Sequence, residues 1–217
     1  MTASLALPGF GDPAVGFDTP FDMLEACHER VLRSLALLQK LQDYLHDHPC
    51  DDSARQAARD VLRYFDMAAP LHHEDEELHV FPPLLASGDA VLRRVVQRLQ
   101  QDHRDMETAW VSVRAALACV AAVPPAGWTD FDAAETASLV GFVRLYERHL
   151  HDEDSLVYPA AQARLSPDAL RALGPHPFER PFGPASVHLA EHRWGPVGRG
   201  LRDTPDKTRR HPCLLVR

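Results

Sequence analysis

Apolar residues recur every three or four positions along four long stretches of the chain, which is the spacing of the buried side of an amphipathic helix. Capping residues such as Thr19 precede these stretches, and short breaks containing proline or glycine separate them. The stretches predict helices over about Pro20 to Asp47, Asp52 to His79, Asp89 to Ala122 and Asp130 to Val157. Long helices joined by short breaks, with no strand pattern between residues 19 and 173, predict an all-α, up-down-up-down four-helix bundle.

Prolines predict where the helices bend or stop. Pro82-Pro83 is expected to end the second helix, because proline has no backbone donor and its ring clashes with the carbonyl four residues earlier. Pro70 lies inside the same helix and is expected to kink it one turn before His72. Ser166-Pro167 is typical of the cap and first turn of a short fifth helix.

The two ends of the chain differ in composition from the predicted bundle. Residues 1–18 are rich in Gly and Pro without helical periodicity and predict a flexible leader, followed by the bundle at 19–173. Residues 174–217 hold seven of the 18 prolines and a charge of +4, from eight basic and four acidic residues, and predict an irregular tail. His188 and His192 lie in this tail without an apolar stripe around them, so they are expected on a surface turn or coil rather than at a metal.

Two of the apolar stripes contain the same polar pattern. His72-x-x-x-Glu76 is followed by Phe81-Pro82, and 77 positions later His149-x-x-x-Glu153 is followed by Tyr158-Pro159. Residues four apart share a helix face, so each pair directs an imidazole and a carboxylate to one point. The stripes that contain these pairs superpose at the same offset and comprise Leu62, Phe65, Ala69 and His79 in the first copy and Leu139, Phe142, Tyr146 and Leu156 in the second. Because the stripes are apolar, the pairs are expected inside the bundle, where a charge needs compensation.

The other two helices each place one histidine in an apolar row. His28 lies between Leu24 and Val31, and His103 lies between Leu99 and Met106. The inward polar groups are then His28, His72, Glu76, His103, His149 and Glu153. This mixture of nitrogen and oxygen donors suits iron, manganese or zinc, and two bridging carboxylates could hold two ions.

Residues beside these positions are expected to have other roles. His73, Glu74, Glu77, His151 and Asp154 lie off the stripe, which favours exposed positions or contacts to a ligand rather than to the metal. A register slipped to His73 and Glu77 is rejected, because only His72 and Glu76 keep the ten-residue distance to proline found in the second copy. Tyr146, Met106 and Trp110 are expected to pack in the core, with contact between the Tyr146 hydroxyl and a bound diatomic molecule as an alternative.

Composition restricts the class of protein. A chain of 217 residues with 45% hydrophobic content fits about one domain, and a net charge of -8 argues against a nucleic-acid partner. Four scattered cysteines without C-x-x-C predict reduced thiols rather than a zinc knuckle or disulfide framework. The first 15 residues lack a secretory pattern, and no apolar run approaches about 18 residues, so a soluble, cytoplasmic protein without a membrane partner is expected.

In residues 19–173 the chain resembles hemerythrin-like proteins. The similarity consists of a histidine in the first helix, H-x-x-x-E before Phe-Pro in the second, Gln101-Asp102-His103 in the third, and H-x-x-x-E before Tyr-Pro in the fourth. The resemblance implies a non-haem, oxo- or hydroxo-bridged centre of two iron ions (Fe2+/Fe3+). In it Glu76 and Glu153 would bridge the ions and the four histidines would be terminal ligands. Ferritin-like bundles instead use Glu-x-x-His and more carboxylates.

One position departs from that family pattern. Oxygen-carrying hemerythrins have a further histidine four residues after the third-helix ligand, where this chain has Glu107. Glu107 could be a further metal ligand, a partner of a ligating imidazole or a solvated residue.

The resemblance implies binding of dioxygen, or of NO or peroxide, for sensing, storage or detoxification. The alternatives are a di-iron enzyme that turns over peroxide or NO or repairs iron-sulfur clusters, and a metal-responsive interaction module. The pattern identifies no protein partner.

Overall fold

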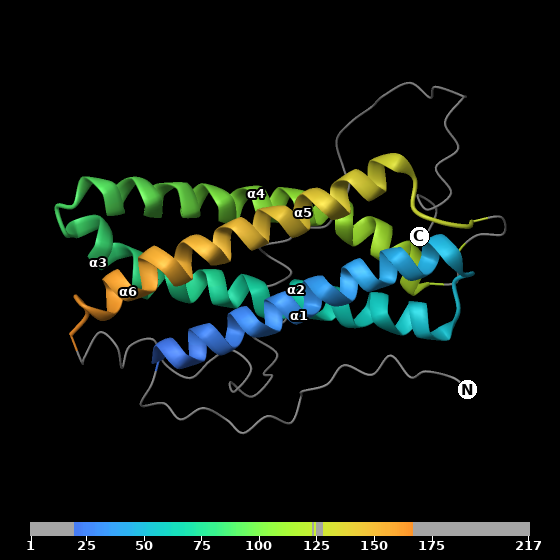
Figure 1. Ribbon diagram of the computed structural model, residues 1–217, viewed down its shortest axis with the longest axis horizontal. Helices are drawn as coiled ribbons and strands as arrows, with labels where there is room; N and C mark the ends of the chain where they lie inside the picture. Colours follow the sequence, from blue (N-terminus) through green and yellow to red (C-terminus); the bar gives the residue numbers. More distant parts are fainter. Residues whose placement is uncertain (1–19, 123, 125–127, 167–217) are drawn as a thin grey trace, which may run out of the picture.

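A computed structural model describes residues 20–122, 124 and 128–166, and these form an all-α bundle (Figure 1). Its long helices run in alternating directions: α1 (Pro20–Asp47), α2 (Asp52–Asp75), α4 (Ala90–Ala121) and α5 (Ala133–Asp152). Short helices α3 (Phe81–Ala86) and α6 (Tyr158–Gln162) continue α2 and α5 at the same end of the bundle. The predicted all-α four-helix bundle is confirmed.

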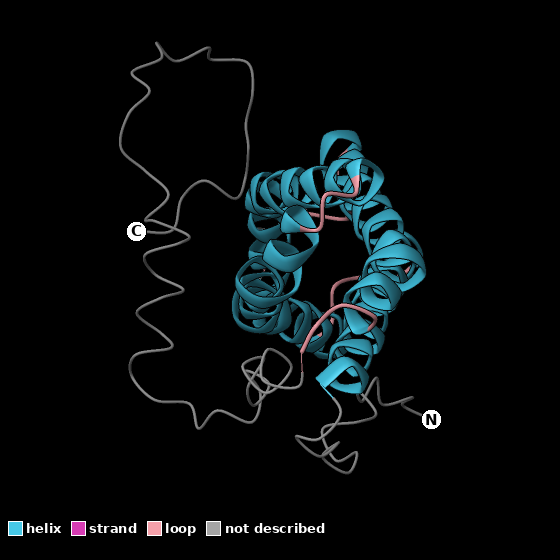
Figure 2. Ribbon diagram, turned by 90° about the vertical axis from the view of Figure 1, so that its left-hand side faces the viewer, coloured by secondary structure: helices cyan, strands magenta, loops and turns pink. Residues whose placement is uncertain are grey.

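The long helices surround a common axis, as the end-on view in Figure 2 shows. α1 contacts α2 and α5, and α4 also contacts α2 and α5, so each long helix has two long neighbours. α3 packs on α4 and α6. Side chains from all four helices therefore meet in the interior.

Aspartate side chains cap three of the long helices. Asp51 accepts a hydrogen bond from the Ala54 backbone N–H, and Asp89 caps α4 in the same way. Asp132 forms a capping box with Glu135, in which each side chain accepts from the other residue's backbone N–H. Each aspartate satisfies backbone donors that the first turn of a helix leaves unpaired.

The expected helix ends at Pro82-Pro83 and near Val157 are wrong, because the chain stays helical through both places. A π-helical turn, η1 (Glu76–Val80), joins α2 to α3, and a second one, η2 (Glu153–Val157), joins α5 to α6. In η1 the Phe81 N–H bonds the carbonyl five residues earlier, at Glu76. The prolines then occupy the first turn of the next helix, where their missing N–H is tolerated.

Each π turn shifts the buried side of the helix by one residue. The α-helical stripes predicted His79 and Leu156 inside, but His79 is only partly buried and Leu156 is 45% exposed. Val80 and Val157 are fully buried in their place. The extra residue in a π turn accounts for the shift, because it rotates the following segment relative to the preceding helix.

Two apolar clusters fill the interior of the bundle on either side of a polar layer. The larger contains Val31, Phe65, Met106 and Phe142, one from each long helix. The smaller lies at the end formed by α3 and α6 and contains Leu24, Phe81, Leu99 and Tyr158. On α1 and α4, and along the continuous helical segments from α2 to α3 and from α5 to α6, the predicted metal-site residues fall between members of the two clusters. Apolar side chains therefore flank the site on both sides.

Some predictions fall outside the described residues. These are the leader at 1–18, the tail at 174–217 with His188 and His192, and the fifth helix from Pro167. Within the described part, Cys27 and Cys50 are free thiols, but Cys119 is disulfide-bonded, which corrects the expectation of four reduced thiols. No helix there combines the length and apolarity needed to cross a membrane.

Candidate metal centre

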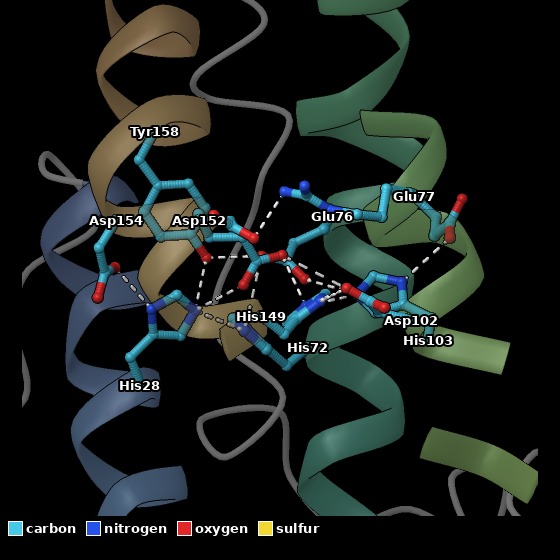
Figure 3. Close-up of polar contacts among 12 residues, drawn as sticks. His28, His72, Glu76, Glu77, Asp102, His103, His149, Asp152, Asp154 and Tyr158 are labelled. Carbon is cyan, nitrogen blue, oxygen red and sulfur yellow. Dashed lines mark hydrogen bonds and ion pairs between the residues drawn. The ribbon is translucent and has the colours of Figure 1, made fainter. Parts of the chain in front are cut away.

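The six inward polar residues predicted from the sequence meet in one place in the bundle (Figure 3). We refer to them as the central cluster: His28 from α1, His72 from α2, Glu76 from η1, His103 from α4, His149 from α5 and Glu153 from η2. Each of them is at most 3% exposed, and both glutamates are fully buried. The structure thus brings the predicted set together, although whether each residue binds metal stays a prediction.

The central cluster consists of two overlapping groups that could each hold an ion. His28 and His72 form one group with both glutamates, and His103 and His149 form the other with the same glutamates. Within each group the potential ligand atoms all lie within 4.8 Å of one another. Because both carboxylates belong to both groups, they lie where they could bridge two ions.

Glu76 faces histidines of both groups. Its Oε1 lies 3.7 Å from His72 Nε2, one turn earlier in the same chain segment. Its Oε2 lies 3.5 Å from His103 Nε2 on α4. The two oxygens of this carboxylate are therefore directed to different groups.

Glu153 repeats this arrangement with the remaining pair. Its Oε1 lies 2.9 Å from His149 Nε2, and its Oε2 lies 3.4 Å from His28 Nε2. Within each group the two imidazoles are also adjacent, because His28 Nε2 and His72 Nε2 are 3.1 Å apart, as are His103 Nε2 and His149 Nε2. The inner nitrogen of every imidazole is Nε2.

Carboxylates outside the central cluster face the other nitrogen of three of these imidazoles, and two of them form a hydrogen bond with it. His28 Nδ1 donates to Asp154 at 2.7 Å and His103 Nδ1 donates to Glu77 at 3.0 Å. His149 Nδ1 lies 3.7 Å from Asp102, which Arg148 also contacts at 2.6 Å. Such partners orient a metal-binding imidazole and raise its basicity.

The sequence left two roles open for Asp154 and Glu77, which were exposure to solvent and contact with a metal-binding residue. The structure shows the second role for both, because each contacts a cluster imidazole. Each directly follows a cluster glutamate, and the two are again 77 positions apart. Asp154 remains 49% exposed, although it holds a buried imidazole. Only the repeat spacing could have marked these two residues as a pair before the structure was known.

Tyr158 is a polar member of the site that the sequence analysis treated only as an aromatic residue before proline. Its hydroxyl donates to Glu76 Oε1 at 2.6 Å and lies 2.9 Å from His28 Nε2. The first copy has Phe81 at the matching position, and Phe81 stacks on His103 with ring centroids 5.6 Å apart. The hydroxyl therefore makes the two halves of the site chemically different.

Buried carboxylates strongly affect the protonation of the imidazoles. Burial lowers the pKa of His28, but the hydrogen bond to Asp154 and the nearby Glu153 outweigh it and raise this pKa to about 9. Burial also lowers the pKa of His149, but the charge of Glu153 and the nearby Asp102 carboxylate raise it to about 10. For Glu153, burial raises the pKa, but His149 and His28 lower it far below its ordinary range.

The donor atoms of the central cluster fit cations. Glu76 Oε2 and both Glu153 side-chain oxygens are buried and accept no hydrogen bond from any residue in the described part of the chain. Buried anionic oxygens need a positive partner, either protonated imidazoles or metal ions. Four nitrogens with two carboxylates suit iron, manganese or zinc better than magnesium or calcium, which prefer all-oxygen sites.

Glu107 and His73 lie near the central cluster but outside the six residues that form it. Glu107 is partly exposed and belongs to neither of the two four-residue groups. It lines a small hollow that has Phe65, Met106, Trp110 and Tyr146 among its walls. His73 also lines this hollow but is only 5% exposed. Tyr146, Met106 and Trp110 belong to the larger apolar cluster, as expected from their spacing.

The remaining neighbours are less buried. Glu74 is partly exposed and His151 is exposed, which agrees with their positions off the stripe.

These features define a helical-bundle protein with a buried histidine and glutamate centre that could hold metal cations. Residues 19–161 match the Hemerythrin HHE cation binding domain. A Haemophilus influenzae protein described as uncharacterized is 30% identical over 160 residues, which cover 74% of this chain and 88% of that relative. No solved structure matches the chain. The chain belongs to the hemerythrin HHE cation-binding domain family.

We predict that, without metal, the free energy of unfolding falls as pH rises from about 6.5 to about 10. The folded pKa values of His28 and His149 lie above the ordinary value of 6.5, at about 9 and about 10. Their protonation therefore stabilises the fold fully below about pH 6.5, and this contribution is lost as pH rises through the folded pKa values. Metal ions displace these protons, so stabilisation by metal should grow over the same range. Thermal unfolding with chelator or with added metal, at about pH 6 and about pH 9, measures both trends. A metal-free Tm that increases with pH would contradict the assignment.

We predict that Glu77→Ala weakens metal binding by about 10- to 100-fold, because it removes the carboxylate that orients His103. Competition titration against a chromophoric chelator measures this loss. Glu29→Ala is the matched control, since Glu29 follows His28 in the chain but is exposed. Equal affinities for the two variants would show that the Glu77 contact does not support metal binding.

Proposed function

We propose that the chain binds two iron ions in the central cluster and uses them to bind dioxygen, or a related small oxidant such as NO or peroxide. Such a protein would serve sensing, storage or detoxification. In this proposal Glu76 and Glu153 bridge the ions, and the four cluster histidines are terminal ligands. When bound, a pair of iron ions supplies reversible one-electron redox chemistry and coordination positions for a small ligand.

The overlap of two four-residue groups at the same two carboxylates supports this proposal most directly. Two separate mononuclear sites would not need shared ligands. A single ion would leave two imidazoles of the other group without a role. Two adjacent ions with common bridging carboxylates would use all six side chains. Membership of a cation-binding family supports metal binding at this site.

The surrounding residues would keep the site rigid and dry. Asp154 and Glu77 fix the ring orientation of His28 and His103, so that each Nε2 is held toward the interior. The apolar clusters on both sides limit access of water, which strengthens electrostatic interactions within the site. Tyr158 holds a hydroxyl proton at Glu76 Oε1, where it restricts movement of that carboxylate.

Anaerobic reconstitution with Fe(II) tests the proposal. We expect about two irons per chain by elemental analysis, a number that follows from the shared-carboxylate arrangement. Admission of air should produce a new charge-transfer absorption band, and a band that disappears on deoxygenation supports dioxygen binding. Irreversible oxidation would instead favour the enzymatic alternative, and absence of iron uptake in parallel with uptake of manganese or zinc would overturn the choice of iron.

We further predict that Glu76→Ala and Glu153→Ala each lose most of both metal ions, because a bridging carboxylate contacts both. Glu74→Ala is the control, since Glu74 lies in the same segment but outside the central cluster. Metal content per folded chain, with helicity checked by circular dichroism, measures the effect. Full two-metal occupancy in either cluster variant would rule out the bridging role.

A further inference from the structure

His73 lies against the central cluster although its place beside the apolar stripe did not predict this. Its ring stacks on that of His103 with centroids 4.1 Å apart and an interplanar angle of 11°. Its ring centroid also lies 5.9 Å from that of His149, with an interplanar angle of 63°. His73 is buried, at 5% exposure, against at most 3% for the cluster residues.

Donor atoms of His73, His103 and His149 form a further potential metal-binding group. All three residues are buried, and one ligand atom from each lies within 4.8 Å of the others. Two of the three belong to the second group of the central cluster, so His73 adds to an existing position rather than forming a separate site.

The internal repeat provides this additional histidine in only one of its two copies. The residue 77 positions after His73 is Leu150, which is buried in the larger apolar cluster and has no donor atom on its side chain. The group formed by His28 and His72 therefore has no matching third imidazole from the equivalent position. The two halves of the site differ in the number of nitrogen donors available.

We propose that His73 is a third imidazole ligand for the metal ion held by His103 and His149, so that the two metal positions are inequivalent. This inference rests on the proposed function, because it requires two ions in the central cluster. The His103 and His149 position then has three nitrogen donors, whereas the His28 and His72 position has two. The second position is the less saturated of the two and is the one adjacent to the Tyr158 hydroxyl.

Binding of His73 requires a small movement of its side chain. Two nitrogens on one ion are at most about 4.2 Å apart, given metal–nitrogen distances of about 2.1 Å, so a spread of up to 4.8 Å must contract slightly. The face-to-face stack on His103 must also open, because both rings must point a nitrogen at the same ion.

His73→Leu tests the proposal, because it places in the first copy the residue type that the second copy has at Leu150. Full-length wild type and variant would be titrated with Fe(II) under anaerobic conditions, and the loaded proteins compared by iron-57 Mössbauer spectroscopy. We expect two distinct iron signals in the wild type. In the variant one ion should bind at least about tenfold more weakly, and one signal should change while the other stays.

His79→Leu is the matched control, since it makes the same change in the adjacent π turn at a residue outside the three metal-binding groups. If His73→Leu does not fold, as judged by circular dichroism with chelator, His73→Asn provides the same comparison with a polar side chain. Unchanged affinity for both ions together with unchanged iron signals in the folded variant would overturn the role of His73. Failure of the wild type to bind two irons would instead refute the proposed function.

Discussion

Burial of two carboxylates in the middle of a helical bundle is the constraint on which the rest of this structure depends. Glu76 and Glu153 have no exposed surface, and three of their four oxygens accept no hydrogen bond from the described residues. An isolated buried carboxylate is strongly unfavourable, so positive charge must be brought to it. Four imidazoles on four different helices meet this requirement, and the same requirement would be met by cations. The relative positions of the helices at this level are therefore set by electrostatics as well as by apolar packing.

The π turns allow one helix segment to serve both the polar layer and the apolar cluster beyond it. In a continuous α-helix the residues following each cluster glutamate would present His79 and Leu156 to the core. The inserted residue instead buries Val80 and Val157, and brings Phe81 and Tyr158 against His103 and His28. The prolines at 82 and 159 then begin new helical turns rather than ending the helix. Local distortion is thus coupled to the geometry of the site, as is common for π turns at functional positions.

Much of this arrangement follows from sequence periodicity. The bounds of α1 and the identity of all six cluster residues could be predicted, because an α-helical stripe places His and Glu four positions apart on one face. The predictions for the residues after Glu76 and Glu153 were wrong, because they assumed a constant 3.6 residues per turn and the chain forms π turns there.

Periodicity within one helix also could not predict which residues contact each other across helices. The partner of His28 is Asp154, 126 positions away, and no spacing within one helix identifies it. His73 was assigned an outer position for the same reason, because its stacking on His103 depends on how α2 and α4 pack.

The internal repeat explains both the similarity and the difference between the two halves of the site. Features that both copies share supply one imidazole, one bridging candidate and one outer carboxylate: His72, Glu76 and Glu77 in the first copy, and His149, Glu153 and Asp154 in the second. Features that differ lie against the imidazoles of the other two helices, because His73 and Phe81 stack on His103 and Tyr158 stacks on His28. In the repeat, Leu150 corresponds to His73 and Tyr158 corresponds to Phe81. A symmetric pair of ions would need only the shared features. The unshared ones place an extra imidazole beside one half and a hydroxyl beside the other. Two unequal metal positions, as proposed above, would therefore depend on residues that the repeat does not preserve.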